Sequence, residues 1–120
     1  MLKVIYIAGP YRNKSEYEVA MNIYWAGECA LDVWKLGGVA LCPHKNTAFF
    51  GGARDIPDEV WIQGDLELLS RCDAILLMPN WKHSTGAKNE RKYAKEHNIT
   101  ILSSRGELRE FLTEKMECKQ

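Results

Sequence analysis

The sequence has 120 residues, of which 46% are hydrophobic and 27% are charged, and its 16 basic residues balance its 16 acidic ones. This length fits one domain, and zero net charge gives no general attraction for a nucleic acid polymer or an anionic membrane. No apolar run approaches the roughly 20 residues of a membrane span, so we expect no membrane partner. A small anionic ligand is compatible with zero net charge, because it needs only a local cluster of charge.

The first half of the chain predicts two strands, a long helix and a long loop. A strand at 2–7 ends at Gly-Pro, and Ser15 with Glu18 forms a capping box that begins a helix reaching about residue 36. The expected inward stripe of this helix consists of Ala20, Ile23, Gly27, Ala30 and Trp34. A short apolar strand at 39–42 follows, and then a loop at 43–57 whose length is typical of functional loops.

The second half repeats the alternation of helices and strands. We expect helices at 58–70, 85–96 and 106–117, with Ser84 as the N-cap of the second, and strands at 74–78 and 99–102. This order predicts a single α/β domain over 1–120, a flavodoxin-like or Rossmann-like doubly wound parallel sheet of four to five strands with flanking helices. The first and third strands are then neighbours, and ligands bind at their carboxyl ends.

The four cysteines are scattered, with no CxxC pair and no histidine at a spacing typical of zinc. We interpret Cys29, Cys42 and Cys72 as small buried hydrophobic residues and Cys118 as part of the tail. This usage predicts a reducing, cytoplasmic location and gives no indication of a metal site.

Two carboxylates stand on helix faces that are otherwise apolar. Glu90 shares its face with Ala87 and Ala94, and Asp65 follows Trp61 by one helical turn. Buried carboxylates are costly unless they are paired or functional, and a converging pair is what glycosidic bond cleavage uses. Each carboxylate also has a structural alternative: a rotated helix exposes Glu90, and Asp65 is a helix cap or forms an ion pair with Arg71 or Lys45.

Other polar residues follow the predicted strands. Arg12, the hydroxyl groups of Ser84 and Thr85, and the amino ends of two helices together suit a phosphate group. His44 is a loop residue or a pocket residue, and Trp81 stacks on a base or covers its loop. The remaining tryptophans are interpreted as core or interface packing, and they are Trp25, Trp34 and Trp61.

Four segments in this order carry a resemblance to a known family. They are Tyr6-Ile7-Ala8-Gly9-Pro10-Tyr11-Arg12, Pro43-His44, Asp65 ahead of Cys72-Asp73-Ala74, and Ser84-Thr85-Gly86-Ala87-Lys88-Asn89-Glu90. Over residues 2–102 the chain resembles the nucleoside 2-deoxyribosyltransferase superfamily, especially its small branch that cleaves nucleoside 5'-monophosphates and its compact phage and bacterial members.

The resemblance implies a role for each matching residue. Glu90 becomes the nucleophile, Asp65 lies near base and sugar, and Tyr6 holds the nucleophile. The implied substrate-binding residues are Gly9, Pro10, Tyr11, Arg12, His44, Trp81, Ser84 and Gly86. In the transferases an Asp at the position of Ser84 binds a free 5'-hydroxyl, whereas a Ser there accepts a phosphate.

We therefore expect an N-glycosidase that hydrolyses the N-glycosidic bond of a (deoxy)nucleoside 5'-monophosphate through Glu90, without metal or cofactor. The alternatives are a nucleoside 2-deoxyribosyltransferase that exchanges bases, and a module that binds or senses a nucleotide without catalysis. The resemblance also implies a homodimer or higher homo-oligomer, in which a neighbouring subunit can complete the site.

Overall fold

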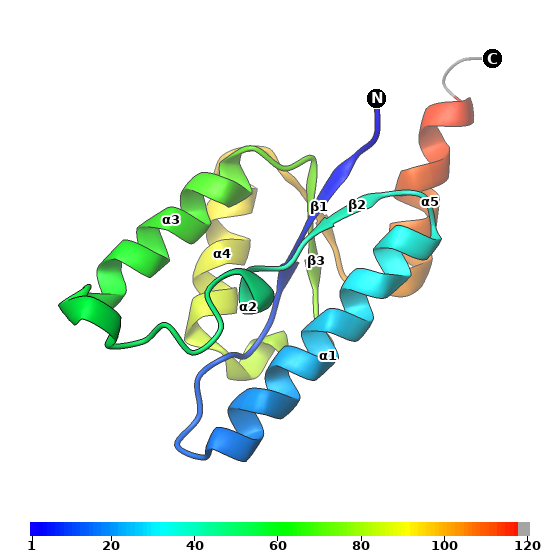
Figure 1. The fold of residues 1–120 in the computed structure, drawn as a ribbon. Helices are drawn as coiled ribbons and strands as arrows, with labels where there is room; N and C mark the ends of the chain where they lie inside the picture. Colours follow the sequence, from blue (N-terminus) through cyan, green and yellow to red (C-terminus); the bar gives the residue numbers. More distant parts are fainter. Residues whose placement is uncertain (118–120) are drawn as a thin grey trace.

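Four parallel strands form the centre of the molecule in the computed structural model, which describes residues 1–117 (Figure 1). The strands are β1 (Val4–Ala8), β2 (Val39–Leu41), β3 (Ala74–Leu77) and β4 (Thr100–Leu102), in the spatial order β2-β1-β3-β4. β1 pairs with β3 from Ile5 opposite Ala74 to Ala8 opposite Leu77. The chain order therefore reverses between β1 and β3, as predicted, and this is where open α/β sheets bind ligands.

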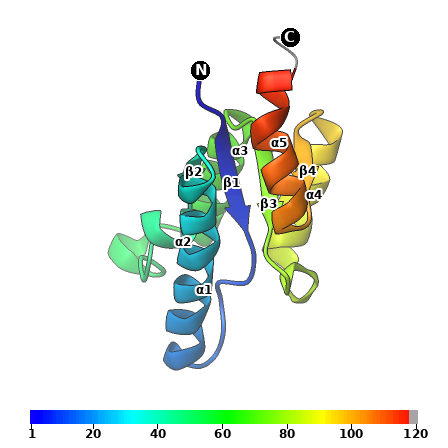
Figure 2. The ribbon, with the colours of Figure 1, turned by 90° about the vertical axis from the view of Figure 1, so that its right-hand side faces the viewer.

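Helices cover both faces of the sheet (Figures 1 and 2). α1 (Glu16–Lys35) and α5 (Arg105–Glu117) lie on one face, and α3 (Asp58–Ser70) and α4 (Thr85–Glu96) lie on the other. Because neighbouring strand residues point to opposite faces, β1 contributes to two hydrophobic cores. Ile5 and Ile7 pack toward α1, whereas Tyr6 and Ala8 pack toward α3 and α4.

Both predicted N-caps are confirmed. The Ser15 hydroxyl accepts a hydrogen bond from the Glu18 N–H at 3.3 Å, and the Ser84 hydroxyl accepts one from the Ala87 N–H at 3.0 Å. Each cap satisfies an N–H group that has no partner within its own helix. The start of α4, which brings Ser84 and Gly86 to the sheet edge, is therefore determined by local sequence.

The prediction for the buried face of α1 was wrong by about one residue. The buried positions are Ala26, Ala30 and Val33, so Ala30 is as predicted, whereas Trp34 is 54% exposed and Trp25 is 52% exposed. Small alanines let the helix pack closely on the sheet, so the large aromatic side chains point outward. Core packing is therefore excluded for these two tryptophans, and packing at an interface stays a prediction.

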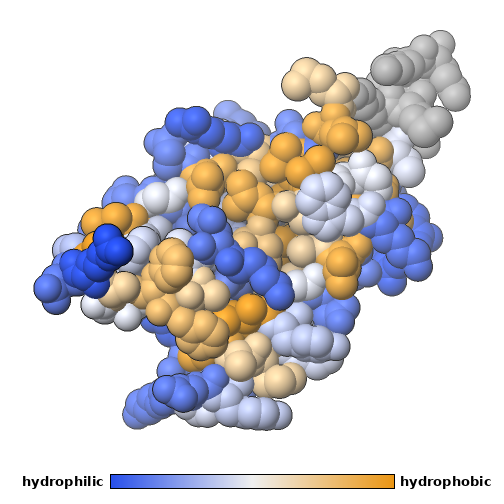
Figure 3. Space-filling model, in the orientation of Figure 1, coloured by the Kyte–Doolittle hydropathy of each residue, from blue (hydrophilic) through white to orange (hydrophobic). Residues whose placement is uncertain are grey.

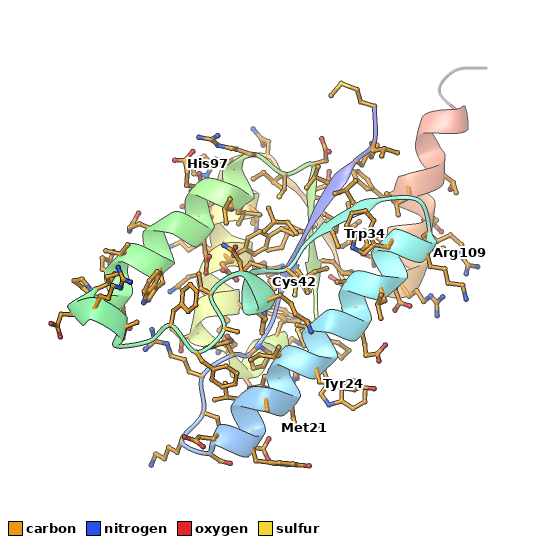
Figure 4. The ribbon with its side chains drawn as sticks, viewed as in Figure 1. Met21, Tyr24, Trp34, Cys42, His97 and Arg109 are labelled. Atoms are coloured by element: carbon orange, nitrogen blue, oxygen red, sulfur yellow. The ribbon has the colours of Figure 1, made fainter. Side chains whose placement is uncertain are left out.

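An apolar groove of about 690 Å³ lies between α1 and the edge strand β2. Tyr24, Trp34 and Cys42 line it (Figure 4). In the space-filling view, hydrophobic side chains lie among hydrophilic ones over the middle of this face (Figure 3). Of the predicted buried cysteines, Cys72 is buried and Cys42 is partly buried, as is Cys29. Cys118 lies outside the described residues.

The predicted loop at 43–57 contains two short helices, α2 (Pro43–Asn46) and η1 (Ala53–Asp55). A third short helix, η2 (Trp81–His83), precedes α4. Three residues of the long connection that are not glycine have left-handed backbones, namely Phe49, Arg54 and Asp55, with φ values of 59°, 51° and 57°. Over residues 1–117, no helix combines the length and apolarity needed to cross a membrane.

The close approach of β1 to the end of β3 gives a stability prediction. A Cβ atom at Gly9 would collide with the Met78 sulfur and lie 2.8 Å from the Met78 Cβ, and Met78 is buried. We expect Gly9→Ala to lower the free energy of unfolding by about 1–3 kcal/mol, because the packed core must shift. Urea denaturation followed by circular dichroism measures this loss.

Gly64→Ala is the matched control. Gly64 lies within α3 and has no atom within 4 Å of an added Cβ. Alanine should raise the free energy of unfolding there by about 0.5–1 kcal/mol, through its higher helix propensity. Equal effects of the two substitutions would contradict the packing described at Gly9.

Candidate active site

A cleft of about 1100 Å³ opens at the carboxyl ends of β1 and β3. Its walls come from the segment after β1, from α2, from residues between α2 and α3, and from the facing sides of α3 and α4. Nine of the predicted site residues line it, namely Gly9, Pro10, Tyr11, Arg12, His44, Asp65, Ser84, Gly86 and Glu90. This volume is slightly above the usual range for small-molecule sites, so the cleft has room for a small molecule.

Glu90 is held at the inner wall of the cleft by β1. The Tyr6 hydroxyl donates a hydrogen bond of 2.5 Å to Oε2 of Glu90. Tyr6 is fully buried, and Ala87 and Ala94 on the same side of α4 are buried as well. The inward orientation of Glu90 is therefore as predicted. Tyr6 does not line the cleft itself but supports the carboxylate from beneath.

The two carboxyl groups have pKa values near neutrality. Burial raises the pKa of Glu90 to about 7, while the Tyr6 hydrogen bond lowers it and the charge of Asp65 raises it. Burial likewise raises the pKa of Asp65 to about 6. Around neutral pH the pair can therefore hold one proton, and its titration belongs to both groups.

Tyr6 keeps its proton and acts as a hydrogen-bond donor. Its pKa is raised far above the ordinary value, first by burial and then by the negative charges of Glu90 and Asp65. A donor fixed in this way stabilises the ionised form of Glu90 and orients it. A phenol below, a second carboxyl nearby and an open cleft suit a carboxylate nucleophile.

His44 supports the segment that follows β1. It is 5% exposed, and its Nε2–H donates to the Pro10 carbonyl at 2.7 Å. Burial lowers the pKa of His44, which favours the neutral ring. The Tyr11 ring lies edge-on to His44 at 5.7 Å, and the Tyr11 hydroxyl accepts a hydrogen bond from the Phe49 N–H at 2.6 Å. His44 and Tyr11 thus tie the β1 segment to the connection beyond α2.

The amino end of α4 forms another wall. Ser84, Thr85 and Gly86 line the cleft there, and the Ser84 hydroxyl is already engaged as the N-cap. Helix amino ends carry partial positive charge and attract negatively charged groups. Binding of an anion at this wall stays a prediction.

Arg12 differs from the expectation of a guanidinium ready for an anion. Its Nη1 forms an ion pair with Oδ2 of Asp58 at 2.9 Å, and both residues line the cleft. Sequence reasoning missed Asp58. Its one signal was the position at the start of a helix after Pro57, where acidic residues are common for structural reasons.

Trp81 is the one predicted substrate-binding residue that does not line the cleft. It packs partly buried against the core beside α3 and α4, and the Arg91 guanidinium lies 5.2 Å from its ring. Trp61 does line the cleft, and its buried indole N–H has no hydrogen-bond partner within the described chain. No cluster of three or more potential metal ligands is found among the described side chains, which are those of residues 1–113.

The comparisons with known proteins agree with this fold. A solved structure of a 2-deoxyribosyltransferase from the bacterium Bacillus psychrosaccharolyticus aligns with a TM-score of 0.62 at 18% sequence identity. The alignment covers 82% of this chain and 69% of that one. The predicted resemblance and fold class are thereby confirmed at the level of the fold.

The sequence comparisons give the family. No curated protein sequence matches the chain. A family model described as a domain of unknown function, DUF4406, matches residues 3–103, which include every predicted site residue. The chain therefore belongs to the DUF4406 family.

Proposed function

We propose that this protein is an enzyme that cleaves the N-glycosidic bond of a nucleoside or nucleotide, with Glu90 as the nucleophile. The observation that carries the proposal is the hydrogen bond of 2.5 Å from buried Tyr6 to a carboxylate that lines an open cleft. Asp65, on the facing helix, supplies the second carboxyl group that such chemistry uses. The fold shared with a 2-deoxyribosyltransferase supports the same reaction class.

The reaction has two steps. In the first, the Glu90 carboxylate attacks C1' of the sugar, the C1'–N bond breaks, and its electron pair leaves with the base. The departing base takes a proton, which Asp65 can donate because its pKa of about 6 keeps a protonated fraction near neutral pH. In the second step, an acceptor attacks C1', loses a proton to Asp65 and releases Glu90 as a carboxylate.

The acceptor distinguishes the two candidate activities. Transfer to another base is supported by the likeness to a transferase, and it is our first candidate. Hydrolysis of a nucleoside 5'-monophosphate is the second, supported by the amino end of α4 and by Ser84, which carries no charge that would repel a phosphate. Both activities require the same glycosyl–Glu90 intermediate.

Glu90→Gln tests the shared step. We expect this variant to lose base release by about a thousandfold or more, because an amide cannot act as the nucleophile. Chromatography of released base measures the loss, with ribo- and deoxyribonucleosides and their 5'-monophosphates as substrates. Adding a second free base separates transfer from hydrolysis, since only transfer yields a new nucleoside.

Glu96→Gln is the control for that experiment, because Glu96 ends the same helix and its side chain is exposed. It should release base at the wild-type rate. If wild-type protein releases no base from any of these substrates, with or without an acceptor, the proposed function is wrong. The same conclusion follows if Glu90→Gln retains full activity.

The pH dependence tests the roles of Tyr6 and Asp65. Glu90 must be ionised to attack, so the rate should rise with pH through the pKa of Glu90. Tyr6→Phe removes the hydrogen bond that lowers this pKa, so the rising limb should move to higher pH. Asp65→Asn removes a negative charge that raises this pKa, so the limb should move to lower pH.

Profiles of kcat/KM against pH for the wild type and the two variants measure these movements. The opposite directions are the decisive feature, because a general loss of activity lowers both profiles without moving them apart. Limbs that stay in place, or that both move in one direction, would exclude Glu90 as the titrating nucleophile.

A further inference from the structure

The charges that line the cleft are mostly negative. Among the described residues that line it, Arg12 is the one arginine or lysine. The acidic side chains that line it are Asp58, Glu59, Asp65 and Glu90. A phosphate dianion that enters this cleft therefore meets one guanidinium, the amino end of α4 and several carboxyl groups.

That guanidinium is already engaged. Arg12 Nη1 and Asp58 Oδ2 are 2.9 Å apart, and the pair joins the segment after β1 to the first turn of α3. Asp58 is stabilised at this place by the positive amino end of its own helix. The Arg12 backbone follows Tyr11, whose carbonyl accepts a hydrogen bond from the Asn22 side chain at 3.2 Å. The backbone is therefore held in place next to Arg12 by this hydrogen bond and at Asp58 by its position in α3.

The ion pair is only partly shielded, because the Arg12 and Asp58 side chains are 64% and 50% exposed. An exposed pair of this kind is weak, so its contribution to folding is small. The pair matters more for ligand binding, because a ligand anion must either share Arg12 with Asp58 or displace Asp58. A neutral hydroxyl group has no such conflict, and it can donate a hydrogen bond to the Asp58 carboxylate.

We propose that Asp58 determines which 5' group the substrate carries: by holding Arg12 it disfavours a 5'-phosphate, so that the cleft selects a nucleoside with a free 5'-hydroxyl. This inference rests on the proposed function, in which C1' lies at Glu90, and it adds that the 5' end of the sugar lies toward Arg12 and Asp58. Asp58 on α3 thereby discriminates against a 5'-phosphate, which Ser84 on α4 cannot do because it carries no charge.

Binding measured without turnover tests this selection. In a Glu90→Gln background, calorimetry gives the Kd of a 2'-deoxynucleoside and of its 5'-monophosphate, for each of the common bases. We expect the background protein to bind the nucleoside more tightly than the monophosphate. Adding Asp58→Asn should shift the ratio of the two Kd values about tenfold toward the monophosphate, because one nearby negative charge is removed and Arg12 is released.

Glu67→Gln is the matched control. Glu67 also lies on α3 and forms an ion pair with an arginine, Arg71, at 3.0 Å, but it does not line the cleft. It should leave the ratio unchanged. Arg12→Ala tests whether Asp58 acts through Arg12. When the guanidinium is absent, Asp58→Asn should improve the binding of the monophosphate much less.

The outcomes separate this inference from the proposed function. If the wild-type protein releases base but Asp58→Asn leaves the ratio of Kd values unchanged, the role of Asp58 is wrong and the proposed function stands. The same holds if the background protein already prefers the monophosphate. If neither ligand binds and no base is released, the proposed function fails, and the selection by Asp58 fails with it.

Discussion

The hydrogen bond from Tyr6 to Glu90 is the interaction on which the account of this molecule depends. It joins the centre of the sheet to α4 at the one position of that helix face where a carboxylate replaces an apolar side chain. A carboxylate at such a place costs several kcal/mol unless a partner compensates for it. This fold keeps the Glu90 carboxylate, supplies the buried Tyr6 hydroxyl as its donor and leaves the carboxylate facing a cleft. Such a departure from ordinary core packing is expected at functional sites.

The same layer of the fold provides both packing and chemistry. Tyr6 and Ala87 belong to the hydrophobic core between the sheet and the helices α3 and α4, and these two helices carry Asp65 and Glu90. The opposite layer, between the sheet and the helices α1 and α5, is an apolar core that includes Ile5, Ala26 and Val33. The strand order reverses between β1 and β3, and the cleft opens there beside the layer that contains α3 and α4. The location of the cleft and the burial of the two carboxyl groups therefore both depend on how α3 and α4 pack on the sheet.

Local sequence predicted much of this arrangement, and the features it missed depend on distant contacts. The caps at Ser15 and Ser84 and the inward face of α4 follow from short-range patterns. The neighbouring β1 and β3 follow from the alternation of helices and strands along the chain. The outward position of Trp34 was missed because a 20-residue helix rich in apolar residues fits several rotations equally well. The pairing of Arg12 with Asp58 was missed because it depends on the path of residues 43–57, whose left-handed residues carry no reliable signal.

Detection of the covalent glycosyl intermediate tests the role of Glu90 as the nucleophile most directly. Protein mixed with a nucleoside and quenched in acid within the first turnover should gain the mass of one glycosyl group. Peptide mass spectrometry should then locate that group on Glu90, and Glu90→Gln should show no gain. A glycosyl group on another residue, or undiminished base release by Glu90→Gln, would contradict the assignment of Glu90 as the nucleophile.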